Sequence, residues 1–265
     1  MRIEISDLHF SYPAGVHALQ GISLTIEAGE QVAIVGQNGA GKTTLARHLN
    51  GLLHPTSGQV KIGDWETREN SVAKLASRIG YVFQNPDEQL FSRDVKTEVA
   101  FGPKNLGYKA ERVQGLVDEA LDMTELSDKT ETNPYDLSPT WRKMVAIASV
   151  IAMDTPIVIF DEPTTGQDAA NIARIANVIK MLRDRGKTVL TITHDIDFCA
   201  ENFERVVAMS QGTILLDGKA NDVFGQDEML AKTYVDPPQI TRLGKRLGLI
   251  QTVKQEAEFL AEFHK

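Results

Sequence analysis

The sequence has little of what marks secreted, membrane-spanning or nucleic-acid-binding chains. Cys199 is the single cysteine, so no internal disulfide can form, which fits a reducing cytoplasm. No apolar run approaches the roughly 18 residues that a spanning helix needs, and the N-terminal residues do not resemble a signal peptide. The formal net charge of −8 argues against binding nucleic acid through a broad basic surface. We therefore expect a membrane role only through a partner, and no nucleic-acid partner.

The composition is otherwise that of an ordinary globular protein. Hydrophobic residues make up 42% of the 265 residues, and charged residues make up 24%. A chain of this length is expected to form one large domain, or one domain with an appendage, and it can bury a sizeable core.

Short apolar runs alternate with helical patterns along most of the chain, which predicts an α/β core. Alternating or β-branched runs predict strands at residues 2–5, 22–26, 31–35, 58–64, 81–83, 156–160 and 188–193, and a terminal hairpin at 206–216. Periodic apolar spacing predicts helices at 111–123, 142–153 and 172–185.

A glycine-rich segment between a strand and a helix has the spacing G-x-x-x-x-G-K-[ST] of a phosphate-binding loop. Its glycines let the backbone turn its N–H groups inward on an anion. Lys42 can reach the β- and γ-phosphates, and the Thr43 hydroxyl can ligate Mg²⁺. The apolar run 31–35 precedes the loop and a helical run follows it, as this loop requires. The loop comprises Gly36, Gln37, Asn38, Gly39, Ala40, Gly41, Lys42 and Thr43.

Two carboxylates follow a second apolar strand, residues 157–160. In enzymes with this loop, a carboxylate at such a strand end holds Mg²⁺, which assigns Asp161. The adjacent Glu162 is then free to polarise a water for attack on the γ-phosphate. His194 follows another apolar strand and can bond a γ-phosphate oxygen. Isolated acidic strand ends and strand-end histidines are common, so it is the combination that predicts nucleotide chemistry.

With these pieces in order, residues 1 to about 225 resemble the ATP-binding subunit of an ATP-binding cassette (ABC) transporter. The resemblance implies an ATPase of the P-loop type with an antiparallel β subdomain, with ATP and Mg²⁺ as ligands. It implies that Tyr12 stacks on adenine, that Gln84 contacts Mg²⁺ and the attacking water, and that Asp168 lies in a loop crossing a dimer interface. The implied nucleotide contacts are Tyr12 and residues 36–44, through Thr44.

The segments 83–91 and 99–103 are further similar to energy-coupling factor (ECF) transporter ATPases of the cobalt and vitamin uptake type. This resemblance implies a peripheral protein on the cytoplasmic face of the cell membrane. Its partners would be a second ATPase, a transmembrane coupling protein and a substrate-binding membrane subunit. Leu90, Phe91, Val99 and Phe101 could supply an apolar groove for the coupling protein, or they could be core residues.

One motif departs from the family pattern. The family carries Leu-Ser-Gly-Gly-Gln before a helix, where its serine and backbone N–H groups grip the γ-phosphate on the other subunit. Here the segment reads Ser138, Pro139, Thr140 and Trp141 after a leucine. Pro139 lacks an N–H donor, and Thr140 adds a Cβ where the backbone should approach closely. We expect an asymmetric pair, in which this chain offers a complete P-loop and a poor signature segment, and we favour a heterodimer over a homodimer.

Two other functions remain open from the sequence. A non-transport ABC ATPase would share the same nucleotide motifs. A regulatory pseudo-ATPase would bind ATP without turnover because of the altered signature segment. We predict a nucleotide-binding domain at residues 1–225, with a helical subdomain at about 87–150, and a small C-terminal helical extension at 226–265. In that extension Ile240, Leu243, Leu247 and Ile250 predict an amphipathic helix that packs on its own domain or contacts a partner.

Overall fold

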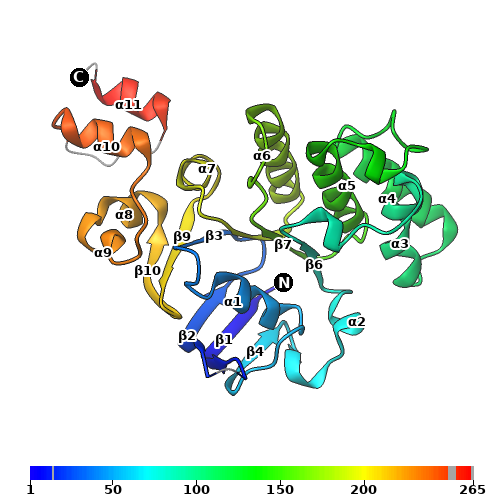
Figure 1. The fold of residues 1–265 in the computed structure, drawn as a ribbon, viewed down its shortest axis with the longest axis horizontal. Helices are drawn as coiled ribbons and strands as arrows, with labels where there is room; N and C mark the ends of the chain where they lie inside the picture. The colour runs from blue at the N-terminus through cyan, green and yellow to red at the C-terminus, as the bar shows by residue number, and fades with distance from the viewer. Residues whose placement is uncertain (14, 250–254, 264–265) are drawn as a thin grey trace. The chain divides into compact units, whose positions relative to one another are not determined.

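The structure is a computed structural model that describes residues 1–13, 15–249 and 255–263 (Figure 1). The chain divides into two compact units. The first contains Met1, Glu27–Glu30 and Asn70–Val189, and the second contains Arg2–Ile26, Gln31–Glu69 and the described residues from Leu190 onward. The predicted boundary at residue 225, between the nucleotide-binding domain and the C-terminal extension, does not coincide with this division and stays a prediction.

The larger sheet has the strand order β10-β9-β3-β8-β7-β6, and the division between the units falls within β8. In the second unit β3 runs parallel to β9, which pairs antiparallel with β10; in the first unit β6 runs parallel to β7. The mixed α/β fold that the sequence predicted is confirmed. The strands are β3 (Gln31–Val35), β6 (Ile79–Val82), β7 (Ile157–Asp161), β8 (Thr188–Ile192), β9 (Arg205–Ser210) and β10 (Thr213–Lys219).

A small antiparallel sheet in the second unit has the order β2-β1-β4-β5. Its centre is the register in which Ile3 faces Ile26 on one side and Ile62 on the other, and all three side chains are completely buried. Alternating apolar residues thus give each strand one core face. Its strands are β1 (Ile3–Ser11), β2 (His17–Ile26), β4 (Ser57–Ile62) and β5 (Trp65–Glu66), followed by a short 3-10 helix at Thr67–Glu69.

In the first unit, helices α3, α4 and α5 pack on one another. In Figure 1 they form the cyan-green to green cluster. The helices of this unit are α2 (Val72–Leu75), α3 (Val95–Asn105), α4 (Ala110–Met123), α5 (Pro139–Ile151) and α6 (Ala169–Asp184), with 3-10 turns at Pro86–Glu88 and Pro134–Asp136.

The second unit also holds α1 (Lys42–Leu49), α7 (Ile196–Asn202), α8 (Ala220–Gly225), α9 (Asp227–Ala231), α10 (Gln239–Arg246) and α11 (Glu256–Phe263). The predicted C-terminal helix is α10. Its buried residues are Thr241 and Gly244, whereas Leu243 and Leu247 are 44% and 51% exposed. Leu243 and Leu247 therefore lie outside the packed face, Ile240 is half-buried, and Ile250 lies outside the described residues. Among the described helices, none is both long and apolar enough to span a membrane.

Several predicted boundaries were wrong; for example, the strands predicted at 2–5 and 22–26 are the longer β1 and β2. Three other errors have a clear local reason. The helix expected from Arg142 begins at Pro139, because Ser138 caps its N-terminus. The helix expected from Ile172 begins at Ala169, because Asp168 caps it. The strand expected at residues 81–83 is Ile79–Val82, because the Phe83 N–H donates to the side chain of Gln89 (3.1 Å).

Candidate functional site

The glycine-rich loop lies in the second unit, between the fully buried strand β3 and helix α1. Gly36 has φ +152°, and a Cβ there would lie 2.3 Å from the Met209 carbonyl oxygen. Gly41, in the left-handed conformation at φ +101°, would place a Cβ 2.7 Å from the Ala18 carbonyl oxygen. Only glycine fits these two positions. The sharp turn that the motif requires is therefore present.

The ammonium group of Lys42 is held within this loop. Its Nζ donates to the carbonyl oxygens of Gly36 (2.7 Å) and Gln37 (3.2 Å), and the residue is only 6% exposed. The adjacent Thr43 is the second residue of α1, in the first turn, where backbone N–H groups lack helical partners. Charge, N–H donors and a hydroxyl thus gather at one helix start, which suits an anion with a bound cation.

Tyr12 is anchored to the same helix. Its hydroxyl lies 3.1 Å from Oγ1 of Thr44, and its ring meets Phe10 edge-on at 4.9 Å. Phe10 in turn contacts the ring of His48 at 4.7 Å. The structure thus brings an aromatic ring to the P-loop helix, as adenine stacking would need. Phe10 and His48 were missed, because nothing in their sequence positions indicates this contact.

His194 follows β8, and its side chain is exposed. The preceding Thr193 donates its N–H to the Ile34 carbonyl oxygen (3.1 Å), two residues before Gly36. The Thr193 hydroxyl accepts the N–H of Asp195 (3.0 Å), and Asp195 caps α7. His194 therefore follows a strand that pairs with the P-loop strand, and its contact with the γ-phosphate stays a prediction.

The carboxylate pair lies in the first unit, at the end of β7. Asp161 and Glu162 are 3% and 6% exposed. The Tyr81 hydroxyl on β6 donates to Oδ2 of Asp161 (2.7 Å). This bond orients the carboxylate that is predicted to ligate the metal. Tyr81 was predicted to lie on a strand, but no role was predicted for it.

Glu162 adopts a left-handed backbone conformation, with φ +47°. This region is unfavourable for residues other than glycine, and such strain is enriched at functional sites. The Thr165 hydroxyl donates to Oε2 of Glu162 (3.3 Å), and the Thr165 N–H donates to the Glu162 carbonyl oxygen (3.4 Å). The turn that follows the strand therefore holds this carboxylate in place.

Gln84 lies in the loop after β6, also in the first unit, with an exposed side chain. Its carbonyl oxygen and that of Phe83 accept hydrogen bonds from Nζ of Lys143 on α5. Burial lowers the pKa of Lys143 to about 8, although the charges of Asp161 and Glu162 partly oppose this shift. A buried amine thus connects the Gln84 loop to the neighbourhood of the carboxylate pair.

The altered signature segment is the start of α5. Oγ of Ser138 accepts the N–H of Trp141 at 3.5 Å, and Pro139 occupies the first turn. The Trp141 ring contacts two cations, Nζ of Lys129 at 4.5 Å and the Arg174 guanidinium at 4.9 Å from its centroid. Trp141 therefore packs on its own chain. Ser138 and the helix N-terminus remain exposed and available to a partner.

Asp168 is the N-cap of α6. Its Oδ1 accepts the N–H of Asn171 (2.8 Å), and the Asn171 side chain reaches the carbonyl oxygen of Thr140 (3.5 Å). Two segments that the resemblance assigns to a dimer interface are thus linked within one unit. Their part in an interface stays a prediction.

The residues present fit Mg²⁺ bound together with a nucleotide. Among the described residues, no group of three or more His, Cys, Asp or Glu side chains could hold a metal ion. Mg²⁺ commonly uses one or two protein ligands plus substrate phosphates and water. The oriented carboxylate of Asp161 in the first unit and the hydroxyl of Thr43 in the second unit are both ligand types that suit this kind of site.

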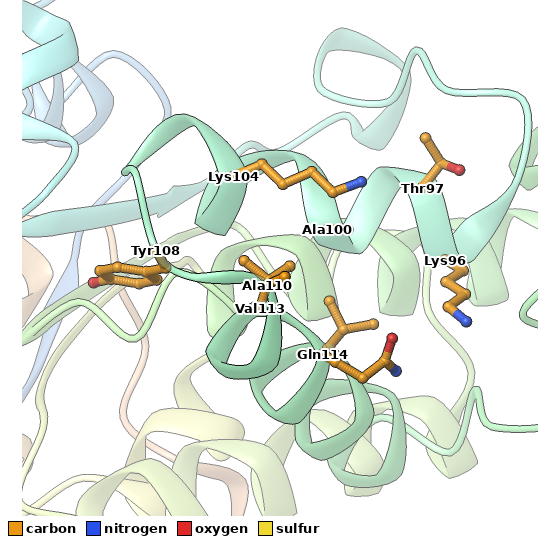
Figure 2. A pocket seen from close by; sticks show the side chains of 9 residues that line it. Lys96, Thr97, Ala100, Lys104, Tyr108, Ala110, Val113 and Gln114 are labelled. Carbon is orange, nitrogen blue, oxygen red and sulfur yellow. The ribbon is translucent and has the colours of Figure 1, made fainter.

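A separate cavity of about 460 Å³ lies between α3 and α4 (Figure 2). Lys96 and Lys104 bring positive charge to it, and Ala100 and Val113 are among its apolar lining residues. None of its lining residues is a glycine or belongs to a predicted nucleotide motif. It is therefore not part of the nucleotide site.

These features define a P-loop nucleotide-binding domain, and comparison with known proteins places it in a family. The family described as "ABC transporter" matches residues 19–165. The chain belongs to the ABC transporter family, as its ATP-binding component.

Curated relatives indicate which type of ABC transporter ATPase the chain is similar to. An energy-coupling factor transporter ATP-binding protein of Methanothermobacter thermautotrophicus is 40% identical over 250 residues, covering 93% of this chain and 80% of the relative. A putative ABC transporter ATP-binding protein of Methanosarcina acetivorans is 42% identical over 248 residues, covering 92% of this chain. The chain spans only 40% of that Methanosarcina protein and 43% of a similar one from Caldanaerobacter subterraneus.

Solved structures agree. The cbiO1 protein of Clostridium perfringens, part of the ABC transporter complex cbiONQ, is 34% identical with a TM-score of 0.79, covering 92% of this chain and 98% of that one. A dimeric ATP-binding cassette, MJ0796, bound to ADP and Pi, is 28% identical with a TM-score of 0.75, covering 82% and 98%. The predicted ABC-type fold is confirmed.

Proposed function

We propose that this chain is the ATP-binding and ATP-hydrolysing subunit of a membrane importer of the energy-coupling factor type. The observation that carries this proposal is that the chain contains both a phosphate-binding loop and a buried carboxylate pair. The loop at Gly36–Thr43 has the required backbone geometry, and two buried carboxylates, Asp161 and Glu162, lie at the end of β7. Similarity to named energy-coupling factor ATPases over 93% of the chain supports the importer type.

In the proposed mechanism, the protein positions ATP and activates water. The loop N–H groups and Lys42 bind the phosphates, and Tyr12 packs on the base. Thr43, Gln84 and Asp161 are the residues that would hold Mg²⁺, which would supply positive charge to the phosphates when bound.

Glu162 would accept a proton from the attacking water. His194 would bond the γ-phosphate and lose that bond after hydrolysis. The chain's residues thus account for both binding and cleavage.

The proposed partner ATPase supplies what this chain lacks. ATP bound here would be completed by a signature segment from another subunit. Pro139 offers no N–H, and Trp141 is packed against Lys129 and Arg174, so a second copy of this chain is a poor donor. We therefore favour a heterodimer in which the competent site uses this chain's P-loop.

An exposed aromatic pair is the best candidate for contact with the transmembrane coupling protein. Phe91 and Phe101 are 60% and 46% exposed, and their rings meet edge-on at 4.6 Å. Leu90 and Val99, predicted as possible members of the same groove, are core residues instead, at 3% and 0% exposure. Attachment through this surface would place the protein at the cytoplasmic face of the membrane, and the membrane subunits would select the metal ion or vitamin.

Co-purification and turnover test the proposal. The chain, expressed with a candidate partner ATPase and membrane subunits, should co-purify with a polytopic membrane protein, and the complex should hydrolyse ATP. A complex that forms and binds ATP without turnover would favour a regulatory pseudo-ATPase. Turnover without any membrane partner in the purified assembly would favour a non-transport ABC ATPase.

A further inference from the structure

Lys143 is the largest of the completely buried side chains, with 1% exposure. It lies in the second turn of α5, the helix that begins at the altered signature segment. Its ammonium group donates to the carbonyl oxygens of Phe83 (3.0 Å) and Gln84 (2.8 Å). One amine therefore joins the signature helix to the backbone of the predicted magnesium and water ligand.

Burying an ammonium group is unfavourable unless the charge is compensated. Here two carbonyl dipoles accept its hydrogen bonds, and Asp161 and Glu162 attract its charge. An apolar side chain such as methionine would fill similar space without this desolvation penalty. It would also leave two carbonyl oxygens without their donor.

Other contacts hold the rest of the same loop to α5. Arg142 pairs with Asp87 at 2.8 Å. The Gln89 amide donates to the Ala146 carbonyl oxygen (2.7 Å) and to the Ser149 hydroxyl (2.9 Å). These contacts fix the loop three and five residues beyond Gln84. Lys143, in contrast, bonds the Gln84 backbone itself.

We propose that Lys143 is a positioning residue for ATP hydrolysis, whose two hydrogen bonds fix the Gln84 backbone to α5. Because the backbone of Gln84 is fixed, its side chain is held in position to contact the metal and the water. Movement of the signature helix is also transmitted directly to Gln84. This inference rests on the proposed ATPase function, and it adds a residue that the sequence motifs do not contain.

Two substitutions separate positioning from packing. Lys143→Met keeps the volume and removes the donor, whereas Lys143→Gln keeps an uncharged donor that can reach one of the carbonyls. Lys180→Met removes an exposed lysine from α6 and serves as the matched control. Each variant is assembled with the partner ATPase and the membrane subunits, and thermal unfolding confirms that it folds.

The readouts are kcat, the Mg²⁺ concentration for half-maximal turnover, and the affinity for ATP in EDTA. For Lys143→Met we expect kcat to fall about 10- to 100-fold and the Mg²⁺ requirement to rise about tenfold, the range for misplaced or unsupported metal ligands. Metal-free ATP affinity should stay within about twofold, and Lys143→Gln should recover at least about a third of wild-type kcat, because one donor remains.

Equal loss in the methionine and glutamine variants would overturn the proposal, as would wild-type kinetics in the methionine variant. A parallel fall in metal-free ATP affinity would also overturn it, because that pattern indicates general damage. If the wild-type complex itself shows no turnover, the proposed ATPase function fails first, so the two failures are distinguishable.

Discussion

The Tyr81 hydroxyl on β6 donates a 2.7 Å hydrogen bond to Oδ2 of Asp161, the carboxylate predicted to ligate Mg²⁺. The two strands run parallel with Tyr81 in register with Ile159, two residues before Asp161. The bond fixes the carboxylate's orientation before a metal arrives. Removing such a hydrogen bond to a metal ligand typically lowers metal affinity by about 10- to 100-fold.

Tyr81→Phe should therefore raise the Mg²⁺ concentration needed for half-maximal turnover by about tenfold, with a smaller effect on metal-free ATP binding. A stability loss of about 1–3 kcal/mol should accompany it, because a buried carboxylate oxygen loses its donor. Magnesium titrations of ATPase rate and chemical denaturation measure the two effects. Tyr234→Phe, at a residue that is 72% exposed, is the control. An unchanged magnesium requirement would show that Tyr81 does not orient Asp161 for Mg²⁺ binding.

Gly36→Ala should abolish ATP binding and destabilise the protein. A Cβ there would lie 2.3 Å from the Met209 carbonyl oxygen, so the loop would have to move. Strain of this kind costs about 1–3 kcal/mol. Gly115→Ala is the matched control, since it lies inside α4 with no atom within 4 Å of the new Cβ. It should stabilise by about 0.5–1 kcal/mol. Nucleotide titration and thermal unfolding test both variants.

Restoring the signature segment should raise the activity of the chain alone. The triple change Pro139→Gly, Thr140→Gly and Trp141→Gln returns two flexible backbone positions and one N–H donor. It also removes the contacts of Trp141 with Lys129 and Arg174, at a cost of roughly 0.5–1 kcal/mol each. We expect turnover by the isolated chain to rise despite the lower stability. An unchanged rate, in a variant that still dimerises and binds ATP, would contradict the role given to this segment.

His48 should make stability depend on pH. Burial lowers its pKa below 6.5, and hydrogen bonds to backbone oxygens, including Nδ1 to the Thr44 carbonyl oxygen (2.7 Å), only partly offset this. The folded state therefore binds its proton less readily than the unfolded state. Stability from this group is intact above pH 6.5 and is lost as pH falls below it.

His48→Gln should consequently show a smaller drop in Tm between pH 7.5 and pH 5.5 than the wild type does. Parallel thermal unfolding scans at the two pH values measure the difference. His17→Gln, at an exposed histidine, should behave like the wild type. If the His48 variant loses as much stability on acidification as the wild type, burial of His48 is not responsible.

Local motifs were predictable from the sequence because their chemistry lies in consecutive residues. The P-loop glycines, the strand before them and the strand-end carboxylates all follow this rule. Contacts between segments distant in sequence were not predictable. Tyr81 reaches Asp161 across 80 residues and Lys143 reaches Gln84 across 59, and no periodicity or spacing encodes either pairing. Helix starts at Ser138 and Asp168 were missed although both are good N-caps, because the apolar pattern begins later.

The most direct test of the account is ATP turnover by three preparations: the chain alone, the chain with a partner ATPase that carries an intact signature segment, and that same pair with Glu162→Gln in this chain. We predict low turnover alone, high turnover in the pair, and a fall of about a hundredfold or more in the Glu162→Gln pair, as expected on removing a general base. Full activity of the isolated chain, or a pair that keeps its rate with Glu162→Gln, would contradict the account.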